Sequence, residues 1–89
     1  MLDTAPNSHM LTGPQIRAAR AMLGWSAKEL AARSGVSYPT IQRAESAHDV
    51  PEMKTGNLLA LQRTLEGSGI TFIDPGEQKP GGHGVRFTG

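Results

Sequence analysis

The residues with the clearest capacity for chemistry lie together in the middle of the chain, at residues 38–46. At helical spacing, Ile41 and Ala44 share one face of this stretch, which predicts that they point inward. The side chains left on the outward face are those of Tyr38, Pro39, Gln42, Arg43 and Ser46. This set is short, mostly polar and free of acidic groups, which suits insertion into the major groove of DNA.

Two short helices joined by a tight turn are needed to present this face. Ser26 is predicted to cap the first helix, in a capping box with Glu29, and Gly35 is predicted to end it in the left-handed conformation. Ser37 is predicted to cap the second helix, with Pro39 in its first turn. The sequence therefore predicts a helix-turn-helix in this part of the chain.

Two further helices are predicted on either side of this unit. The first begins at a capping box formed by Thr12 and Gln15, and it stops at Gly24. The other spans roughly residues 55–66, where leucines recur at helical spacing. Four helical signals therefore account for most of the chain.

Two short apolar segments near the C-terminus, residues 70–73 and 85–87, are predicted strands. They could pair as a hairpin, although the long connection between them leaves its closure open. An unpaired strand seeks an edge, and two copies of one chain can satisfy each other across a two-fold axis. The candidate dimer interface consists of Ile70, Phe72, Ile73, Val85 and Phe87.

The length of 89 residues allows one compact domain. We expect residues 1–10 to form a disordered tail or to be the remnant of an expression tag. Residues 11–69 are then the helix-turn-helix domain, and residues 70–89 are a strand-containing tail.

Composition excludes several classes of protein. The absence of cysteine excludes a disulfide framework, a thiolate metal site and a cysteine nucleophile. No apolar run is long enough for a membrane-spanning helix, so we expect a soluble protein of the bacterial cytoplasm or nucleoid. The three histidines, His9, His48 and His83, have no partners at metal-ligand spacing, and no nucleophile–base arrangement is supported. We therefore expect no metal, no cofactor and no catalysis.

The net charge of +1 gives no overall basic field. Basic side chains nevertheless outnumber acidic ones by five to three between residues 11 and 49. Any anion-binding surface is therefore expected in the first half of the chain.

Four stretches of this sequence resemble the phage Cro/C1-repressor (Xre) helix-turn-helix family. They are Gln15–Arg20 (QIRAAR), Trp25–Ala31 (WSAKELA), Ser34–Ser37 (SGVS) and Thr40–Glu45 (TIQRAE). The resemblance spans about residues 11–65. It implies a compact all-α bundle of four to five helices, here followed by a short C-terminal β-strand or hairpin segment, and operator binding as a homodimer.

The resemblance also implies roles for individual residues. Base edges would be read by Tyr38, Pro39, Gln42 and Arg43. In this role Arg43 suits guanine and Gln42 suits adenine, while Tyr38 would touch either a thymine methyl group or a phosphate. Phosphates would be contacted by Ser26, Lys28, Ser37 and Thr40.

Arg20 and Glu45 match the positions of a structural ion pair in the family. The sequence departs from the family pattern at Ala27, where a phosphate-binding glutamine is frequent, and at Ser34, where an apolar residue is usual. Lys28 would then contact the phosphate in place of that glutamine, or it would be a solvated side chain at the start of the helix. Arg17 and Arg33 are interpreted as ordinary surface charges.

These features predict a sequence-specific DNA-binding transcriptional regulator, a repressor, that binds a palindromic operator as a homodimer. One alternative is an antitoxin-like or adaptor protein, whose tail binds a partner protein while the helix-turn-helix regulates its own gene. Another is a control protein encoded by a transposon or phage, which would use the same chemistry.

Overall fold

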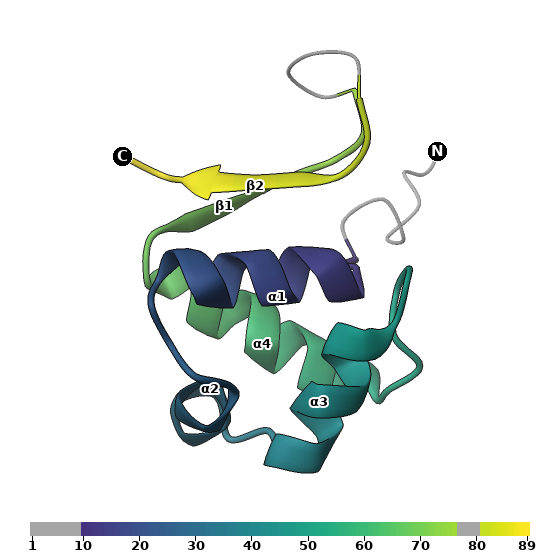
Figure 1. The fold of residues 1–89 in the computed structure, drawn as a ribbon, viewed down its shortest axis with the longest axis vertical. Coiled ribbons are helices and arrows are strands. Elements are labelled where there is room, and N and C mark those ends of the chain that lie inside the picture. Colours follow the sequence, from purple (N-terminus) through teal and green to yellow (C-terminus); the bar gives the residue numbers. More distant parts are fainter. Residues whose placement is uncertain (1–9, 77–80) are drawn as a thin grey trace.

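Four helices followed by two strands make up the described part of the chain, residues 10–76 and 81–89, in the computed structural model (Figure 1). The helices are α1 (Gly13–Met22), α2 (Ala27–Ser34), α3 (Tyr38–Ser46) and α4 (Thr55–Gly67), and the strands are β1 (Ile70–Ile73) and β2 (Gly84–Phe87). Where the family pattern implied four to five helices, the described residues contain four. The expectation of a disordered tail or tag remnant concerns residues that, apart from Met10, lie outside the described ones.

The helix starts follow the predicted caps. The hydroxyl of Thr12 accepts from the backbone of Gln15, whose side chain accepts in return from the Thr12 backbone, so the predicted capping box is present. Ser26 caps α2 by accepting from the backbone of Glu29 at 3.0 Å. The carboxylate of Glu29, however, accepts from Arg33 at 2.9 Å, one helical turn further along. The second capping box is therefore present only in its serine half.

The turn between α2 and α3 has the predicted backbone. Gly35 lies in the left-handed region at φ 79°, which only glycine adopts at low cost. Ser37 then caps α3 by accepting from the backbone of Thr40, and Pro39 lies in the first turn. These local features make the two helices short and bring α3 directly against α2.

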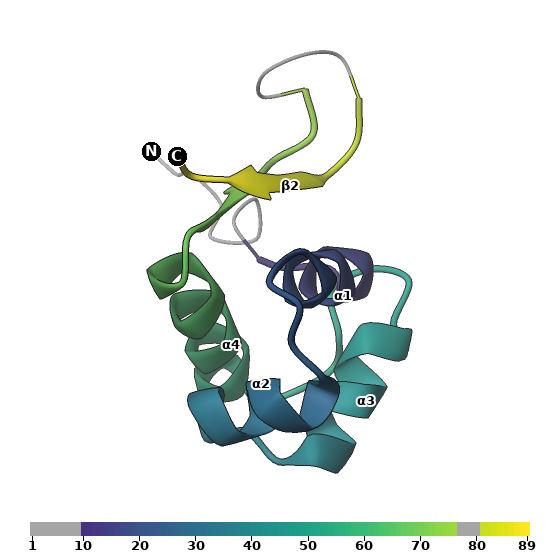
Figure 2. The same ribbon diagram turned by 60° about the vertical axis from the view of Figure 1, so that its left-hand side comes forward.

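The core lies between the four helices. It is built from aliphatic side chains that are at most 3% exposed, among them Leu11, Ile16, Leu30, Val36, Ile41, Leu58, Leu61 and Leu65. Helix α3 contacts both α1 and α2, and α4 packs on α2 and α1 (Figure 2). The inward face of α3 is thus locked to its neighbours, and its other face is left at the surface.

The two strands pair as an antiparallel hairpin in which Ile70 faces Phe87 and Phe72 faces Val85. The closure that the sequence left open is therefore formed. The hairpin contacts α1 through β2 and α4 through β1. Figures 1 and 2 both place it on the side of α1 away from α2 and α3. Within residues 10–76 and 81–89, no helix is long and apolar enough to cross a membrane.

Candidate nucleic-acid interface

The outward face of α3 carries the side chains that the sequence assigned to base reading. Pro39, Gln42 and Arg43 are exposed, and Tyr38 is half-buried. Ile41, on the opposite face, is completely buried in the core. The structure therefore brings the four predicted residues together on one accessible surface of one helix.

Within this face, Tyr38 contacts two other predicted residues. The side-chain nitrogen Nε2 of Gln42 donates a hydrogen bond to the hydroxyl oxygen of Tyr38 at 3.1 Å. The Nζ atom of Lys28, at the start of α2, lies 5.7 Å from the centre of the Tyr38 ring, which is within cation–π range. A residue expected to meet phosphate thus lies beside residues expected to meet bases.

A second group of hydrogen bonds lies at the start of α3. The hydroxyl of Ser37 donates to Oγ1 of Thr40 at 2.8 Å, and Nη2 of Arg43 is 3.5 Å from the same oxygen. Ser37 and Thr40 therefore organise the first turn of the helix, and both remain near its N-terminal end, where backbone amides favour a phosphate. Ser26 has the equivalent capping role at the start of α2.

Arg43 stands between two hollows of the surface. One is lined by Gln42, Arg43, Ser46 and Ala47, and the other extends from Arg43 and Thr40 to the loop before α4. The guanidinium is exposed, and the hydrogen bond that it makes to Thr40 is a long one. It is therefore available to a ligand that approaches α3 from solvent.

Arg20 and Glu45 form the ion pair that the resemblance implied. Nε and Nη2 of Arg20 donate to the two carboxylate oxygens of Glu45 at 2.7 and 2.9 Å, while Nη1 donates to the Trp25 carbonyl. The Glu45 side chain is only 10% exposed. The hydrogen bond with Glu45, opposed by partial burial, raises the pKa of Arg20 above its ordinary value. Both charges are thus used to join α1 to α3.

Arg17 has a structural role that the sequence interpretation missed. Its Nη1 atom donates to the backbone carbonyl of Glu45 at 2.8 Å, near the end of α3. An arginine at this end of a helix also interacts favourably with the helix dipole. The available signal was spacing, because Arg17 precedes Arg20 by three residues and therefore shares its face of α1.

Two other contacts also depart from the sequence interpretation. The guanidinium carbon Cζ of Arg33 lies 4.3 Å from the centre of the Trp25 ring, and the same guanidinium pairs with the Glu29 carboxylate. Arg33 is therefore more than an isolated surface charge. Gly13 lies so close to the end of α3 that an added Cβ would overlap the carbonyl oxygen of Ala47 and lie 2.6 Å from that of Ala44. The Arg33–Glu29 pair has the i, i+4 spacing of a local helix contact, whereas the close approach at Gly13 depends on how α1 meets the end of α3.

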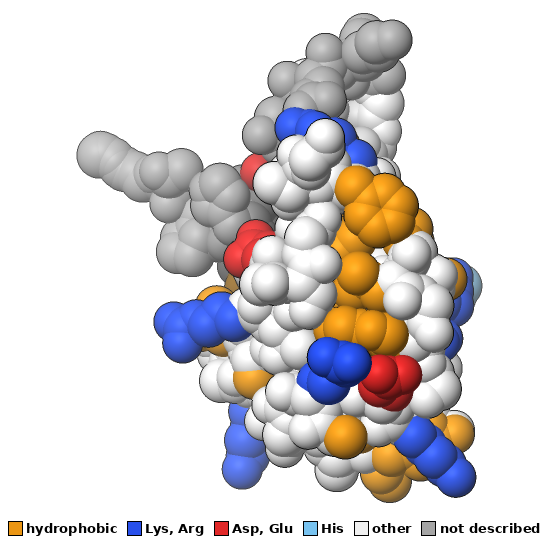
Figure 3. All heavy atoms as spheres, turned by 90° about the vertical axis from the view of Figure 1, so that its left-hand side faces the viewer, with side chains coloured by type: hydrophobic (Ala, Val, Ile, Leu, Met, Phe, Trp, Pro, Cys, Tyr) orange, Lys and Arg blue, Asp and Glu red, His pale blue; other side chains and the backbone are white. Residues whose placement is uncertain are grey.

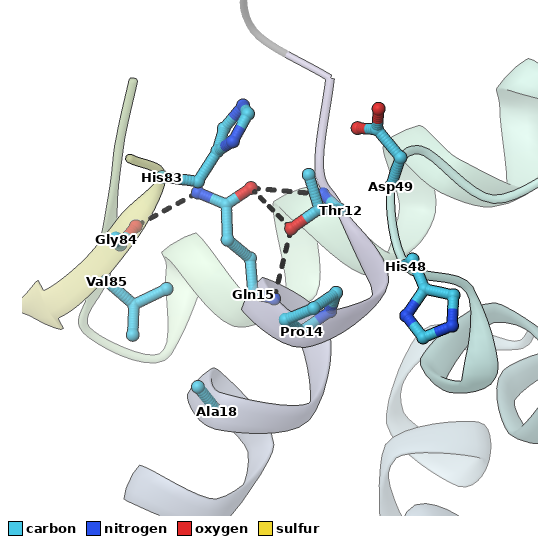
Figure 4. Close-up of a pocket in the computed structure, with 9 residues that line it drawn as sticks. All are labelled: Thr12, Pro14, Gln15, Ala18, His48, Asp49, His83, Gly84 and Val85. Atoms are coloured by element: carbon cyan, nitrogen blue, oxygen red, sulfur yellow. Dashed lines mark hydrogen bonds between the residues drawn. The ribbon is translucent and has the colours of Figure 1, made fainter. Parts of the chain in front are cut away.

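A pocket of about 520 Å³ separates the hairpin from the loop after α3. Figure 4 shows Gln15 at its centre, hydrogen-bonded to Thr12 on one side and to the carbonyl of Gly84 on the other, with His48 and His83 on opposite sides. Among the described residues, no group of three or more histidine, cysteine or acidic side chains is placed to hold a metal ion.

The hairpin residues proposed for a dimer interface differ in accessibility. Ile70 is 1% exposed and belongs to the core of the single chain, so it is not part of the surface. Phe72, Ile73 and Val85 are half-buried, whereas Phe87 is 52% exposed. Figure 3 shows hydrophobic side chains gathered in a column on the face where β2 ends.

Comparison with known proteins agrees with this geometry. A search of curated proteins found no match to the chain. Residues 16–62, slightly more than half of the chain, match the family model described as Helix-turn-helix. That region includes most of α1, both helices of the predicted unit and the larger part of α4. The chain therefore belongs to the Cro/C1-type helix-turn-helix family of DNA-binding regulators.

Proposed function

We propose that this protein is a sequence-specific transcriptional repressor that binds a palindromic operator as a homodimer in the bacterial cytoplasm. The observation that carries the proposal is the charge of α3. Glu45 is the single acidic residue of that helix, and it is buried against Arg20. The outward face therefore offers hydrogen-bonding and basic groups to DNA without a repelling carboxylate.

Base reading is assigned to the exposed side chains of α3. The guanidinium of Arg43 matches the two acceptors of guanine, and the amide of Gln42 matches the acceptor and donor of adenine. Tyr38 and Pro39 lie at the N-terminal end of the same face, where the apolar part of each suits a thymine methyl group. Phosphate contacts are assigned to the flanking residues Ser26, Lys28, Ser37 and Thr40, which set the register of the helix on the duplex.

The dimer is supported by the hairpin. Phe87 is a large apolar side chain that is half exposed at the end of β2, and a second copy would remove it from water. The hairpin lies on the side of α1 opposite α3, so its burial leaves the reading face open (Figures 1 and 2). A two-fold related pair of α3 helices would enter successive major grooves about 34 Å apart.

Selection of bound sites from random duplex DNA at two salt concentrations tests the proposal. We expect an enriched palindrome whose half-sites are about one helical turn apart. We also expect about four to six phosphate contacts per dimer, so that log affinity falls against log salt with a slope of about −3.5 to −5.5. Recovery of no enriched sequence, with binding of all DNA alike, would contradict sequence-specific regulation.

The dimer has its own test. Phe87→Ser should shift the molar mass in solution from dimer toward monomer, while the circular dichroism of the helices is retained, because Phe87 is exposed and contributes little to the core. Leu59→Ser is the matched control, since Leu59 on α4 is 41% exposed. A Phe87→Ser protein that remains dimeric would reject the hairpin as the interface.

The same exposed apolar face favours a second candidate function, in which the hairpin binds a different protein while the helix-turn-helix controls its gene. This is the antitoxin-like or adaptor role. The two candidates differ in the mass of the purified chain, because a partner-binding hairpin leaves it monomeric and a repressor of the proposed kind is a dimer.

A further inference from the structure

The hydrogen bond between Tyr38 and Gln42 determines which donor and acceptor groups of the Gln42 amide remain available to a ligand. A glutamine side chain carries one acceptor oxygen and two N–H donors. One donor is directed to the Tyr38 hydroxyl oxygen, at 3.1 Å. The oxygen Oε1 and the second N–H remain, and they are adjacent on an exposed side chain.

One acceptor next to one donor is a selective combination. Adenine alone presents, side by side in the major groove, an acceptor at N7 and a donor at N6. Guanine presents two acceptors, one of which would face Oε1 without a hydrogen, and cytosine and thymine each present a single polar group there. An amide held in this way therefore favours adenine over the other bases.

Tyr38 is itself held by the protein. It is half-buried, it follows the Ser37 cap directly, and the Lys28 ammonium lies 5.7 Å from its ring centre. Its hydroxyl oxygen is therefore a fixed point one helical turn before Gln42. Without this hydrogen bond, the long Gln42 side chain would lose rotamer freedom when the protein binds DNA, and that loss lowers affinity. The hydrogen bond already restricts this freedom in the free protein.

We propose that Tyr38 is the positioning residue for Gln42, and that the two side chains act as one unit that selects adenine. This inference rests on the proposed sequence-specific function and deepens it. Tyr38 then influences base choice through the amide of Gln42, and its phenol retains its own O–H for a further acceptor.

The test compares base preference among four proteins: the unmodified chain, Tyr38→Phe, Gln42→Ala and the double variant. Sites are first selected from random duplex DNA with the unmodified chain. Affinity is then measured for duplexes in which each base pair of the selected site is changed in turn. Tyr38→Phe keeps the ring and its contact with Lys28 and removes only the hydroxyl. Ser46→Ala is the control, because Ser46 lies on the same exposed face and bonds the Gln42 backbone carbonyl, not its amide.

Gln42→Ala should abolish an adenine preference of about five- to hundredfold at one base pair per half-site. Tyr38→Phe should reduce the preference at that same base pair by about two- to tenfold. It should have no further effect when Gln42 is already alanine, and Ser46→Ala should leave the preference unchanged. The readout is a ratio between sites, so a variant that is merely less stable would lower all affinities and leave the ratio intact.

Three results would overturn the proposal. They are an unchanged ratio in Tyr38→Phe, a change at a different base pair, and losses that add in the double variant. Failure of the proposed function looks different, because the unmodified chain would then enrich no sequence, and both proposals would fall together.

Discussion

Glu45 on α3 receives two hydrogen bonds from the guanidinium of Arg20 on α1, at 2.7 and 2.9 Å. The Glu45 carbonyl also accepts from Arg17, one turn earlier on α1. Helix α1 therefore holds the C-terminal half of α3 through both the side chain and the backbone carbonyl of Glu45. As a result, the inward face of α3 is fixed, and its outward face carries no acidic side chain.

Breaking this ion pair should destabilise the fold. Arg20→Met leaves the Glu45 carboxylate in a site that is only 10% exposed, and we expect the free energy of unfolding to fall by about 1.5–3 kcal/mol. Urea unfolding followed by circular dichroism measures this change. Glu29→Gln, which removes an ion pair whose side chains are 41% and 50% exposed, should cost only about 0.3–0.5 kcal/mol. Equal losses in the two variants would contradict the structural role of Arg20.

The raised pKa of Arg20 gives this contribution a definite pH dependence. A group whose pKa is higher in the folded state stabilises the fold below its unfolded-state pKa, and the stabilisation is lost only as pH rises through the folded-state value. Both values lie far above neutrality for arginine. The difference in unfolding free energy between the unmodified chain and Arg20→Met should therefore not fall through titration of Arg20 between about pH 6 and about pH 10.

Gly13 should not tolerate a side chain. In Gly13→Ala the new methyl group would overlap the Ala47 carbonyl oxygen and press on that of Ala44, so α1 and α3 would have to separate. We expect a loss of about 1–3 kcal/mol in unfolding free energy, measured by thermal or urea denaturation. Gly56→Ala is the matched control, because a Cβ there meets no atom within 4 Å, and it should leave stability unchanged or increase it. An unchanged unfolding free energy in Gly13→Ala would disprove the close approach of α1 to the end of α3.

Gln15 should determine how firmly the hairpin is attached. Its Nε2 atom donates to the Gly84 carbonyl at 2.9 Å, while its Oε1 atom accepts from the Thr12 backbone at 3.0 Å. Gln15→Ala removes both hydrogen bonds, the first partly buried and the second buried, and we expect a loss of about 1–3 kcal/mol in unfolding free energy. Hydrogen exchange should be faster at the amides of β1 and β2 than in the unmodified chain. Gln62→Ala, on α4, should leave the exchange rates of the hairpin amides unaltered. Unaltered exchange rates in Gln15→Ala would show that Gln15 does not attach the hairpin to α1.

Arg43 should specify a base. Arg43→Ala is expected to relax preference at one base pair per half-site, with a loss of about 1–3 kcal/mol of discrimination there. Affinity measurements on single-base variants of the selected operator give this value. Arg86→Ala, in the hairpin on the other side of α1 from α3, serves as the control and should keep the full preference (Figure 1). Uniform weakening on every duplex would instead assign Arg43 to a phosphate.

Much of the local structure of this protein could be predicted from its sequence. The caps at Thr12, Ser26 and Ser37 and the left-handed Gly35 set the starts and turns of the helices, since each acts within a few residues of itself. The family pattern and the outward face of α3 follow from the same short-range spacing. The helix-turn-helix therefore needed no distant information.

Other features depended on how the elements meet. The spacing places Arg17 on the same face of α1 as Arg20, but it does not show which group that face meets. Only the position of α3 beside α1 gives Arg17 the Glu45 carbonyl. Glu29 is a different case, because both of its possible partners are local. It was expected to complete the cap at Ser26, and its carboxylate instead pairs with Arg33, one helical turn further along α2.

The sequence by itself therefore determined the helices, their caps, the family and which side chains α3 turns outward, because these depend on contacts between near neighbours in the chain. The tertiary structure alone decided that the hairpin closes, that Ile70 enters the core, and that Gln15 joins the hairpin to α1. Each of these joins residues far apart in sequence, and local patterns carry no information on which distant surface a strand will reach.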